Sequence, residues 1–225
     1  TITVTSWGDL KAEVETADGA EVIIVQGTLT AGVASDEIKV KRDVTIKGKD
    51  SHAILDAGEK CRIFKVSNGV ILKLKDVTLK KGKEELGVGV YVTEASLELE
   101  NVIITECKST SGVGKGGAIY INNLSHNGRL WIKGTSKIEV NGAYTGAGIY
   151  INTASGENII EGNTEIKGNK CFASGNGGGI YIEKGNLVLK DNTKIFGNES
   201  KNSDTDVGGG GIYIKSGSTL TIKDS

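Results

Sequence analysis

The chain has 225 residues, with 33 glycines, no proline, 5% aromatic residues and a net charge of −1. Its regularly spaced apolar residues exclude a disordered chain, and abundant glycine without a three-residue period excludes collagen. The lysines are spread along the sequence rather than clustered, so we expect no nucleic-acid partner. No segment reaches the roughly 18 consecutive apolar residues of a membrane helix, so we expect no direct membrane insertion.

Residues 1–20 are expected to form an N-terminal cap that contains a short helix. Ser6 can cap this helix with Asp9 at the third helical position, and Gly19 can end it. One face of the helix is apolar: Trp7, Leu10, Val14 and Ala17. We therefore expect the helix to cover the first coil of the stack. That coil would begin with the run EVIIVQGTL at 21–29.

A glycine-led segment recurs along the remaining chain, as GGAIYI at 116–121, GAGIYI at 146–151 and GGGIYI at 177–182 and 209–214. GVGVYV at 87–92 and RIFKVS at 62–67 are earlier, degenerate copies. The equivalent apolar positions are Phe64, Val90, Ile119, Ile149, Ile180 and Ile212, at successive offsets of 26, 29, 30, 31 and 32 residues. A repeat of this length is typical of a solenoid.

Two more short segments follow in each repeat, and both alternate as half-buried strands do. The second segment has paired apolar positions: Leu72/Leu74, Leu97/Leu99, Leu130/Ile132, Leu187/Leu189 and Leu220/Ile222. The third centres on Leu79, Ile104, Ile138, Ile166 and Ile195. Three strands per repeat predict an all-β fold, a right-handed parallel β-helix. We expect a three-sheet solenoid of about seven rungs at ~4.8 Å spacing. The whole of 1–225 is expected to be one β-helix domain, with coils over 21–225.

Corner positions follow each third strand: Gly82, Cys107, Asn141, Asn169 and Asn198. Asparagine tolerates a left-handed backbone, and stacked asparagines can bond to one another along the column. One rung departs from the pattern, because Asn158 falls where other rungs have an inward leucine. We expect a distortion or a buried hydrogen bond there.

The three cysteines, Cys61, Cys107 and Cys171, have no metal-ligand spacing, and we expect buried, unpaired thiols. The final TLTIKDS is the second strand of an incomplete rung, and the chain has no methionine. We therefore expect a monomeric fragment of a longer protein, in which further coils continue the stack.

The GGAIYI units alternate with turns such as IKGN at 166–169 and IFGN at 195–198. In this the chain resembles the GGAI/FxxN repeat region of bacterial polymorphic outer-membrane proteins and other pectate-lyase-like surface β-helices. The opening, with SWGDL, VTIKG and ILDAG, is similar to the first rungs of that superfamily. The resemblance implies a bacterial protein that is secreted or displayed at the cell surface.

Polysaccharide lyases and hydrolases also use this fold, and for carboxylates to meet they must occupy equivalent outward positions on adjacent rungs or alternate outward positions on one strand. No cluster of three acids arises, and Asp56 and Asp76 fall at turns, where aspartate is common for backbone reasons. We therefore expect no catalytic residue and no cofactor. Asp204 and Asp206 are a weak calcium candidate, because calcium needs about six to eight oxygen ligands.

The outward position of the glycine-led strand is always aromatic from the second copy on: Tyr91, Tyr120, Tyr150, Tyr181 and Tyr213. Such a stripe can stack on sugar rings or anchor a partner protein. It can equally stabilise neighbouring strands through same-face pairing. Trp131, outward on another sheet, is a second candidate contact.

These observations favour a non-catalytic surface or secreted module, an adhesin or display stalk that binds a glycan or a host or cell-surface protein. The alternative is a polysaccharide-active enzyme, lyase or hydrolase, or a carbohydrate-binding β-helix. An acidic cluster holding calcium would indicate the enzyme.

Overall fold

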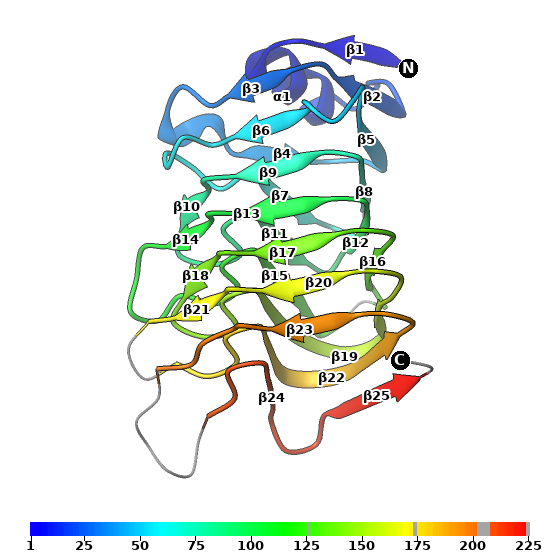
Figure 1. The fold of residues 1–225 in the computed structure, drawn as a ribbon. Coiled ribbons are helices and arrows are strands. Elements are labelled where there is room, and N and C mark those ends of the chain that lie inside the picture. The colour runs from blue at the N-terminus through cyan, green and yellow to red at the C-terminus, as the bar shows by residue number, and fades with distance from the viewer. Residues whose placement is uncertain (126, 173–174, 202–207, 224–225) are drawn as a thin grey trace.

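The computed structural model describes residues 1–125, 127–172, 175–201 and 208–223. The chain folds as an all-β parallel solenoid of about six turns in three sheets, with one short helix near its N-terminus (Figure 1). One sheet has seven stacked strands, in line with the predicted number of rungs. The fold predicted from the repeat is therefore confirmed.

The glycine-led segments form the first face of the rod. They pair in parallel and in register, so Ile119, Ile149 and Ile180 lie side by side. The strands of this face are β4 (Ile38–Val40), β7 (Phe64–Ser67), β11 (Val90–Thr93), β15 (Ile119–Asn123), the start of β19 (Ile149–Ile160), the start of β22 (Ile180–Lys190) and β24 (Ile212–Ile214).

The second and third faces follow in each turn. The second face consists of β1 (Ile2–Val4), β2 (Val22–Val25), β5 (Val44–Gly48), β8 (Ile71–Lys75), β12 (Ser96–Glu100), β16 (Leu130–Lys133), the ends of β19 and β22, and β25 (Thr219–Lys223). The third consists of β3 (Thr28–Thr30), β6 (Ile54–Asp56), β9 (Thr78–Lys80), β13 (Ile103–Thr105), β17 (Lys137–Glu139), β20 (Glu165–Lys167) and β23 (Lys194–Phe196).

The repeat predicts one sheet for each face, but the three sheets of the structure do not correspond to the three faces in this way. Because β19 and β22 continue around the corner, the first and second faces belong to one 14-stranded sheet. The third sheet is small and lies after the third face: β10 (Lys83–Glu84), β14 (Lys108–Ser109), β18 (Gly142–Ala143) and β21 (Lys170–Cys171). Strands of two residues show no alternation, so the sequence pattern did not indicate them.

Inward side chains form the predicted apolar columns. Ile119, Ile149 and Ile180 are fully buried, whereas Ile212 is only partly buried in the last stacked strand of the face. Leu130 and Leu187 are likewise buried, and Leu220 is partly buried. Burial of each inner side chain thus depends on rungs on both sides of it.

The helix α1 (Trp7–Glu15) covers the N-terminal end of the stack (Figure 1). The Ser6 side chain accepts a hydrogen bond from the Asp9 backbone N–H, as predicted. Three of the four predicted apolar residues are buried: Trp7, Leu10 and Val14. Ala17 is exposed, because the backbone is already extended at Thr16 and the helix ends before Gly19. The stack also begins earlier than predicted, since β1 precedes the helix and pairs with β2.

The corner after the third face holds a buried asparagine ladder. The Asn141 side chain donates to the Asn169 side-chain oxygen at 3.0 Å, and Asn169 donates in turn to Asn198 at 2.9 Å. Each also donates to the backbone carbonyl of an inward isoleucine on the preceding rung. The predicted bonding along the column is confirmed, but the left-handed residue is the one before each asparagine, as at Val140 (φ 59°).

Glycine is required where the chain enters the first face. Gly116, Gly146 and Gly177 have φ of 66°, 59° and 66°, a region that favours glycine. A Cβ atom on Gly116 would lie 2.3 Å from the Ile119 carbonyl oxygen. The GGxI spacing therefore reflects a tight turn directly before the strand.

The unusual Asn158 is fully buried opposite Leu187, and the expected buried hydrogen bonds are present. Its side chain accepts from the Leu130 backbone N–H at 3.2 Å and donates to the Asn186 carbonyl at 2.9 Å. It also donates to the Thr153 hydroxyl. These bonds offset the cost of burying an amide in the core.

The three cysteines are unpaired and buried, as predicted. Burial raises the pKa of the Cys107 thiol to about 12 and of Cys61 and Cys171 to about 11. Neutral, enclosed thiols of this kind are poor nucleophiles.

Truncation of Ile149 tests the stacked core. Ile149→Ala removes a fully buried side chain between two rungs, so the free energy of unfolding should fall by roughly 2–5 kcal/mol in urea titrations. Ile159→Ala, on the same strand but half-buried on the outer surface, is the matched control and should cost clearly less. Equal losses for the two variants would contradict the assignment of inward and outward positions.

Candidate binding surfaces

The five predicted tyrosines form one continuous stack on the outside of the first face. Successive rings lie 5.0–5.2 Å apart between centroids, with planes inclined by 14° or less. The tyrosine column comprises Tyr91, Tyr120, Tyr150, Tyr181 and Tyr213. Parallel in-register pairing sets this geometry, because it places equivalent side chains one strand spacing apart.

The middle of the tyrosine column is not open to solvent. Tyr150 is 2% exposed and Tyr120 is also buried, while the remaining three rings are half-buried. Each inner ring packs a neighbour on both of its faces. A ligand can therefore reach the column only at ring edges and hydroxyl groups, and it cannot stack flat on an inner ring.

Charged side chains contact the tyrosine column. The Arg62 guanidinium lies 4.9 Å from the centroid of the Tyr91 ring and forms an ion pair with Glu37. The Lys115 ammonium lies 4.9 Å from the Tyr150 ring centroid. The Arg62 contact, on the end ring of the column, is a cation–π contact of the kind that adds about 0.5–1 kcal/mol at exposed sites. Both faces of Tyr150 are covered by neighbouring rings, so Lys115 contacts it at the hydroxyl.

The Tyr150 hydroxyl belongs to a polar network. It accepts from Lys115 at 3.3 Å and donates to Glu183 at 3.1 Å, and Glu183 also forms an ion pair with Lys215. Burial and the Glu183 charge raise the pKa of Tyr181 to about 12, and the pKa of Tyr150 is raised for the same reasons. Burial opposes ionisation of Glu183, but hydrogen bonds from Lys215 and Tyr150 outweigh it and lower its pKa.

Trp131, the second predicted contact, lies half-buried on the second face. Its indole N–H donates to Glu161 at 2.8 Å, and Arg129 and Lys133 lie 4.9 and 4.5 Å from the ring centroid. The indole is thus already engaged by three charged neighbours.

Ion pairs run along the second face between adjacent rungs. Glu98 pairs with Lys73 at 3.4 Å and with Arg129 at 2.9 Å. Glu100 pairs with Lys75 at 2.7 Å and with Lys133 at 3.2 Å. The hydrogen bond from Lys75 lowers the pKa of Glu100. Exposed pairs contribute only about 0–1 kcal/mol each, so these ion pairs add little to the free energy of unfolding.

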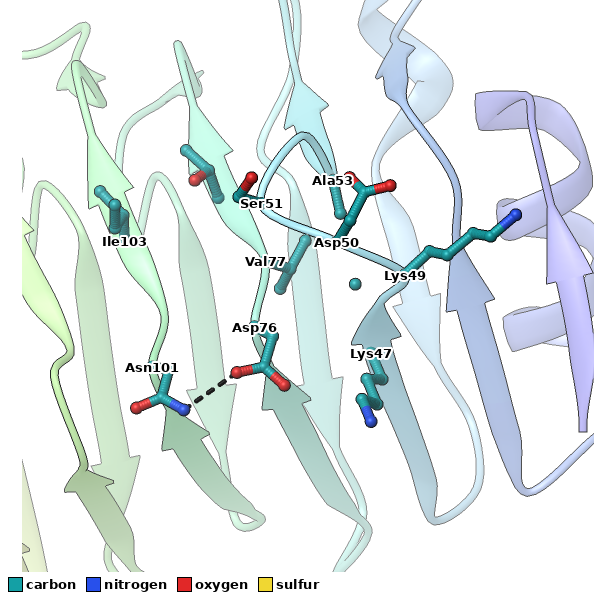
Figure 2. Close-up of a pocket in the computed structure, with 11 residues that line it drawn as sticks. Lys47, Lys49, Asp50, Ser51, Ala53, Asp76, Val77, Asn101 and Ile103 are labelled. Atoms are coloured by element: carbon teal, nitrogen blue, oxygen red, sulfur yellow. Dashed lines mark hydrogen bonds between the residues drawn. The ribbon is translucent and has the colours of Figure 1, made fainter.

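A polar cleft lies at the corner between the second and third faces, near the N-terminal end of the rod (Figure 2). Its volume is about 480 Å³, and its wall is the loop that carries Lys49, Asp50 and Ser51. Asp76 lies between Asn101 and Lys47 in this view, and Asn101 donates to its carboxylate at 2.9 Å. The sequence placed Asp76 at a turn without assigning it to a site.

Within the described ranges no group of three or more histidine, cysteine, aspartate or glutamate side chains could hold a metal ion. The weak calcium candidates, Asp204 and Asp206, lie outside the described residues. In the part of the chain that the structure describes, no helix has the length and apolar character needed to cross a bilayer.

Comparison with known proteins does not assign this chain to a family. No protein-family model, curated protein or solved structure matches the chain.

Alkaline titration tests the burial of the tyrosine column. Because the pKa values of Tyr120, Tyr150 and Tyr181 are raised in the folded chain, folding favours their neutral form. This stability is fully present below the unfolded tyrosine pKa of about 10 and is lost as pH rises through the folded values. Tyrosinate absorbance should therefore lag behind that of a free tyrosine and rise together with loss of the circular dichroism of the sheet. A single midpoint near pH 10 for the whole rise in tyrosinate absorbance, with the sheet signal intact, would contradict this.

Proposed function

We propose that this chain is a non-catalytic β-solenoid module of a bacterial surface or secreted protein, acting as an adhesin or display stalk. The observation that carries the proposal is the uninterrupted side-chain stacking along the rod, in the isoleucine columns, the asparagine ladder and the tyrosine column. These stacks make an extended, stiff support with repeating outer surfaces. The GGAIYI resemblance to bacterial surface β-helices supports the location, by analogy of motif alone.

The partner of such a module is a glycan or a protein on a host or cell surface. The ring edges and hydroxyls of Tyr91 and Tyr213, at the two ends of the column, are half-buried and can contribute contacts at the margins of such an interface. The buried Tyr120 and Tyr150 support the rod instead.

The second candidate function is a polysaccharide-active enzyme or a carbohydrate-binding β-helix. One observation favours it, the cleft whose lining includes Asp50, Asp76 and Lys47. Carboxylates can serve as acid and base in glycoside cleavage, and a lysine can serve as base in a lyase.

A double substitution separates support from binding in the tyrosine column. Tyr150→Ser with Tyr181→Ser removes three ring–ring contacts and the partner of Lys115, so thermal melts and urea titrations should show a loss of about 2–5 kcal/mol. Tyr213→Ser, at the end of the column, removes one contact and is the control with a smaller loss. Glycan-array binding of the double variant should be unchanged; lost binding with unchanged stability would assign the column to recognition.

An activity assay tests the absence of catalysis. Incubation of the whole chain with pectate, alginate and glycosaminoglycans, with calcium present, should give no unsaturated product absorbing in the ultraviolet and no new reducing ends. Turnover of any of these polymers, abolished by Asp76→Asn, would replace the proposed function with the enzyme.

A further inference from the structure

The corner cleft exists because one rung turns differently from its neighbours. The rungs that contain β8–β9 and β12–β13 turn this corner with a short connection. Two residues lie between β8, which ends at Lys75, and β9, which begins at Thr78, and two also lie between β12 and β13. In the rung before them β5 ends at Gly48 and β6 begins only at Ile54. The longer loop stands out from the corner and forms a wall beside the tight turns.

The floor of the cleft is held in a fixed arrangement. A Cβ atom on Gly48 would lie 1.9 Å from the Asp76 carbonyl oxygen, so the loop can pass this close to the next rung only with glycine. Asp76 and Asn101 both have left-handed backbones, with φ of 51° and 55°, and their side chains are hydrogen-bonded to each other. The Asn101 oxygen also accepts from the Thr135 backbone N–H at 3.0 Å, which fixes the amide orientation.

Several polar groups in the cleft have unused bonding capacity. Among the described residues, one Asp76 carboxylate oxygen accepts from Asn101 and the other accepts no hydrogen bond. Lys47 has neither a hydrogen-bond nor an ion-pair partner in the described part of the chain. The Ser51 hydroxyl completes this set, and the half-buried Ile103 supplies a small apolar area (Figure 2).

The charge of the cleft restricts its ligand. Lys49 points away from the cleft and donates to Gln26 at 3.0 Å, and Asp50 accepts from the His52 backbone N–H at 2.8 Å (Figure 2). The charges left for a ligand are Lys47 and Asp76, so a cation meets an ammonium group and a polyanion meets a carboxylate. A ligand rich in hydroxyl groups satisfies both, because a hydroxyl donates to a carboxylate and accepts from an ammonium. The C–H face of a sugar ring also fits the apolar area, and the volume lies within the ~300–1,000 Å³ range of small-ligand pockets.

We propose that this corner cleft binds a short stretch of uncharged saccharide, with Asp76 accepting from sugar hydroxyls and Lys47 donating to sugar oxygens. The inference rests on the proposed function as a binding module, and it names the class of ligand and the site at which the module binds it. The site is a recognition site, and no bond is made or broken in it.

The test uses the full chain and a panel of neutral tetrasaccharides built from glucose, galactose, mannose and N-acetylglucosamine, with tetragalacturonate as the acidic probe. Binding is measured by calorimetry. At least one neutral probe should bind, and Asp76→Asn and Lys47→Gln should each weaken its affinity at least tenfold. Asparagine tolerates the left-handed backbone at this position, so Asp76→Asn should leave the melting temperature nearly unchanged.

The matched control is Asp191→Asn. Asp191 occupies the same corner several rungs away, with φ of 56°, and its carboxylate accepts from the Gly162 backbone N–H at 2.9 Å. It does not line the cleft, so its substitution should leave saccharide affinity unchanged.

Three results would overturn the cleft assignment: no neutral probe binds, the Asp76 and Asp191 variants behave alike, or only tetragalacturonate binds. None of these affects the proposed module function, which would stand on surfaces elsewhere. Cleavage of a bound probe would instead overturn the module function, and it is detected separately as new reducing ends.

Discussion

Parallel, in-register pairing between rungs is the constraint on which the rest of this structure depends. It places each residue directly beside its equivalent in the next turn, as Tyr120 lies beside Tyr150 and Ile119 beside Ile149. Any side chain chosen at one position must therefore tolerate a copy of itself, or a complement, one strand spacing away. Apolar columns, amide ladders, stacked rings and alternating charges are four solutions to that one requirement, and this chain uses all of them.

The repeat made the fold predictable from the sequence, because the glycine-led segment is repeated with few changes and its offsets are nearly constant. The inward columns, the asparagine ladder and the buried Asn158 follow from that register, whereas the capped helix follows from the local pattern of Ser6, Asp9 and an apolar face. The short strands such as Gly142–Ala143 were not predictable, since two residues carry no periodic signal. The early start at Ile2 was missed because that strand belongs to the stack only through its pairing with β2.

The candidate surfaces were predictable in part. Alignment of the repeats placed the five tyrosines in one column, but it gave no information on exposure, which depends on how Lys115 and Glu183 close over the rings. The cleft was missed for the opposite reason, since it arises where the repeat fails. The one signal present in the sequence is the extra length between VTIKG and ILDAG, which pushes a loop away from the corner that Asp76 and Asn101 turn tightly.

The direction of the hydrogen bonds has a mechanical consequence for a rod of this kind. The strands lie across the rod, so the backbone bonds between rungs run along its length, and β1 and β25 lie at opposite ends (Figure 1). Tension applied along the axis pulls these bonds open in sequence, as in a zipper, instead of shearing many at once. Each rung that opens lengthens the molecule by the unfolded chain of one whole turn, while the neighbouring rungs stay folded. Under load such a rod would extend in steps and re-form rung by rung when the force falls, with the asparagine ladder and the stacked rings setting the height of each step.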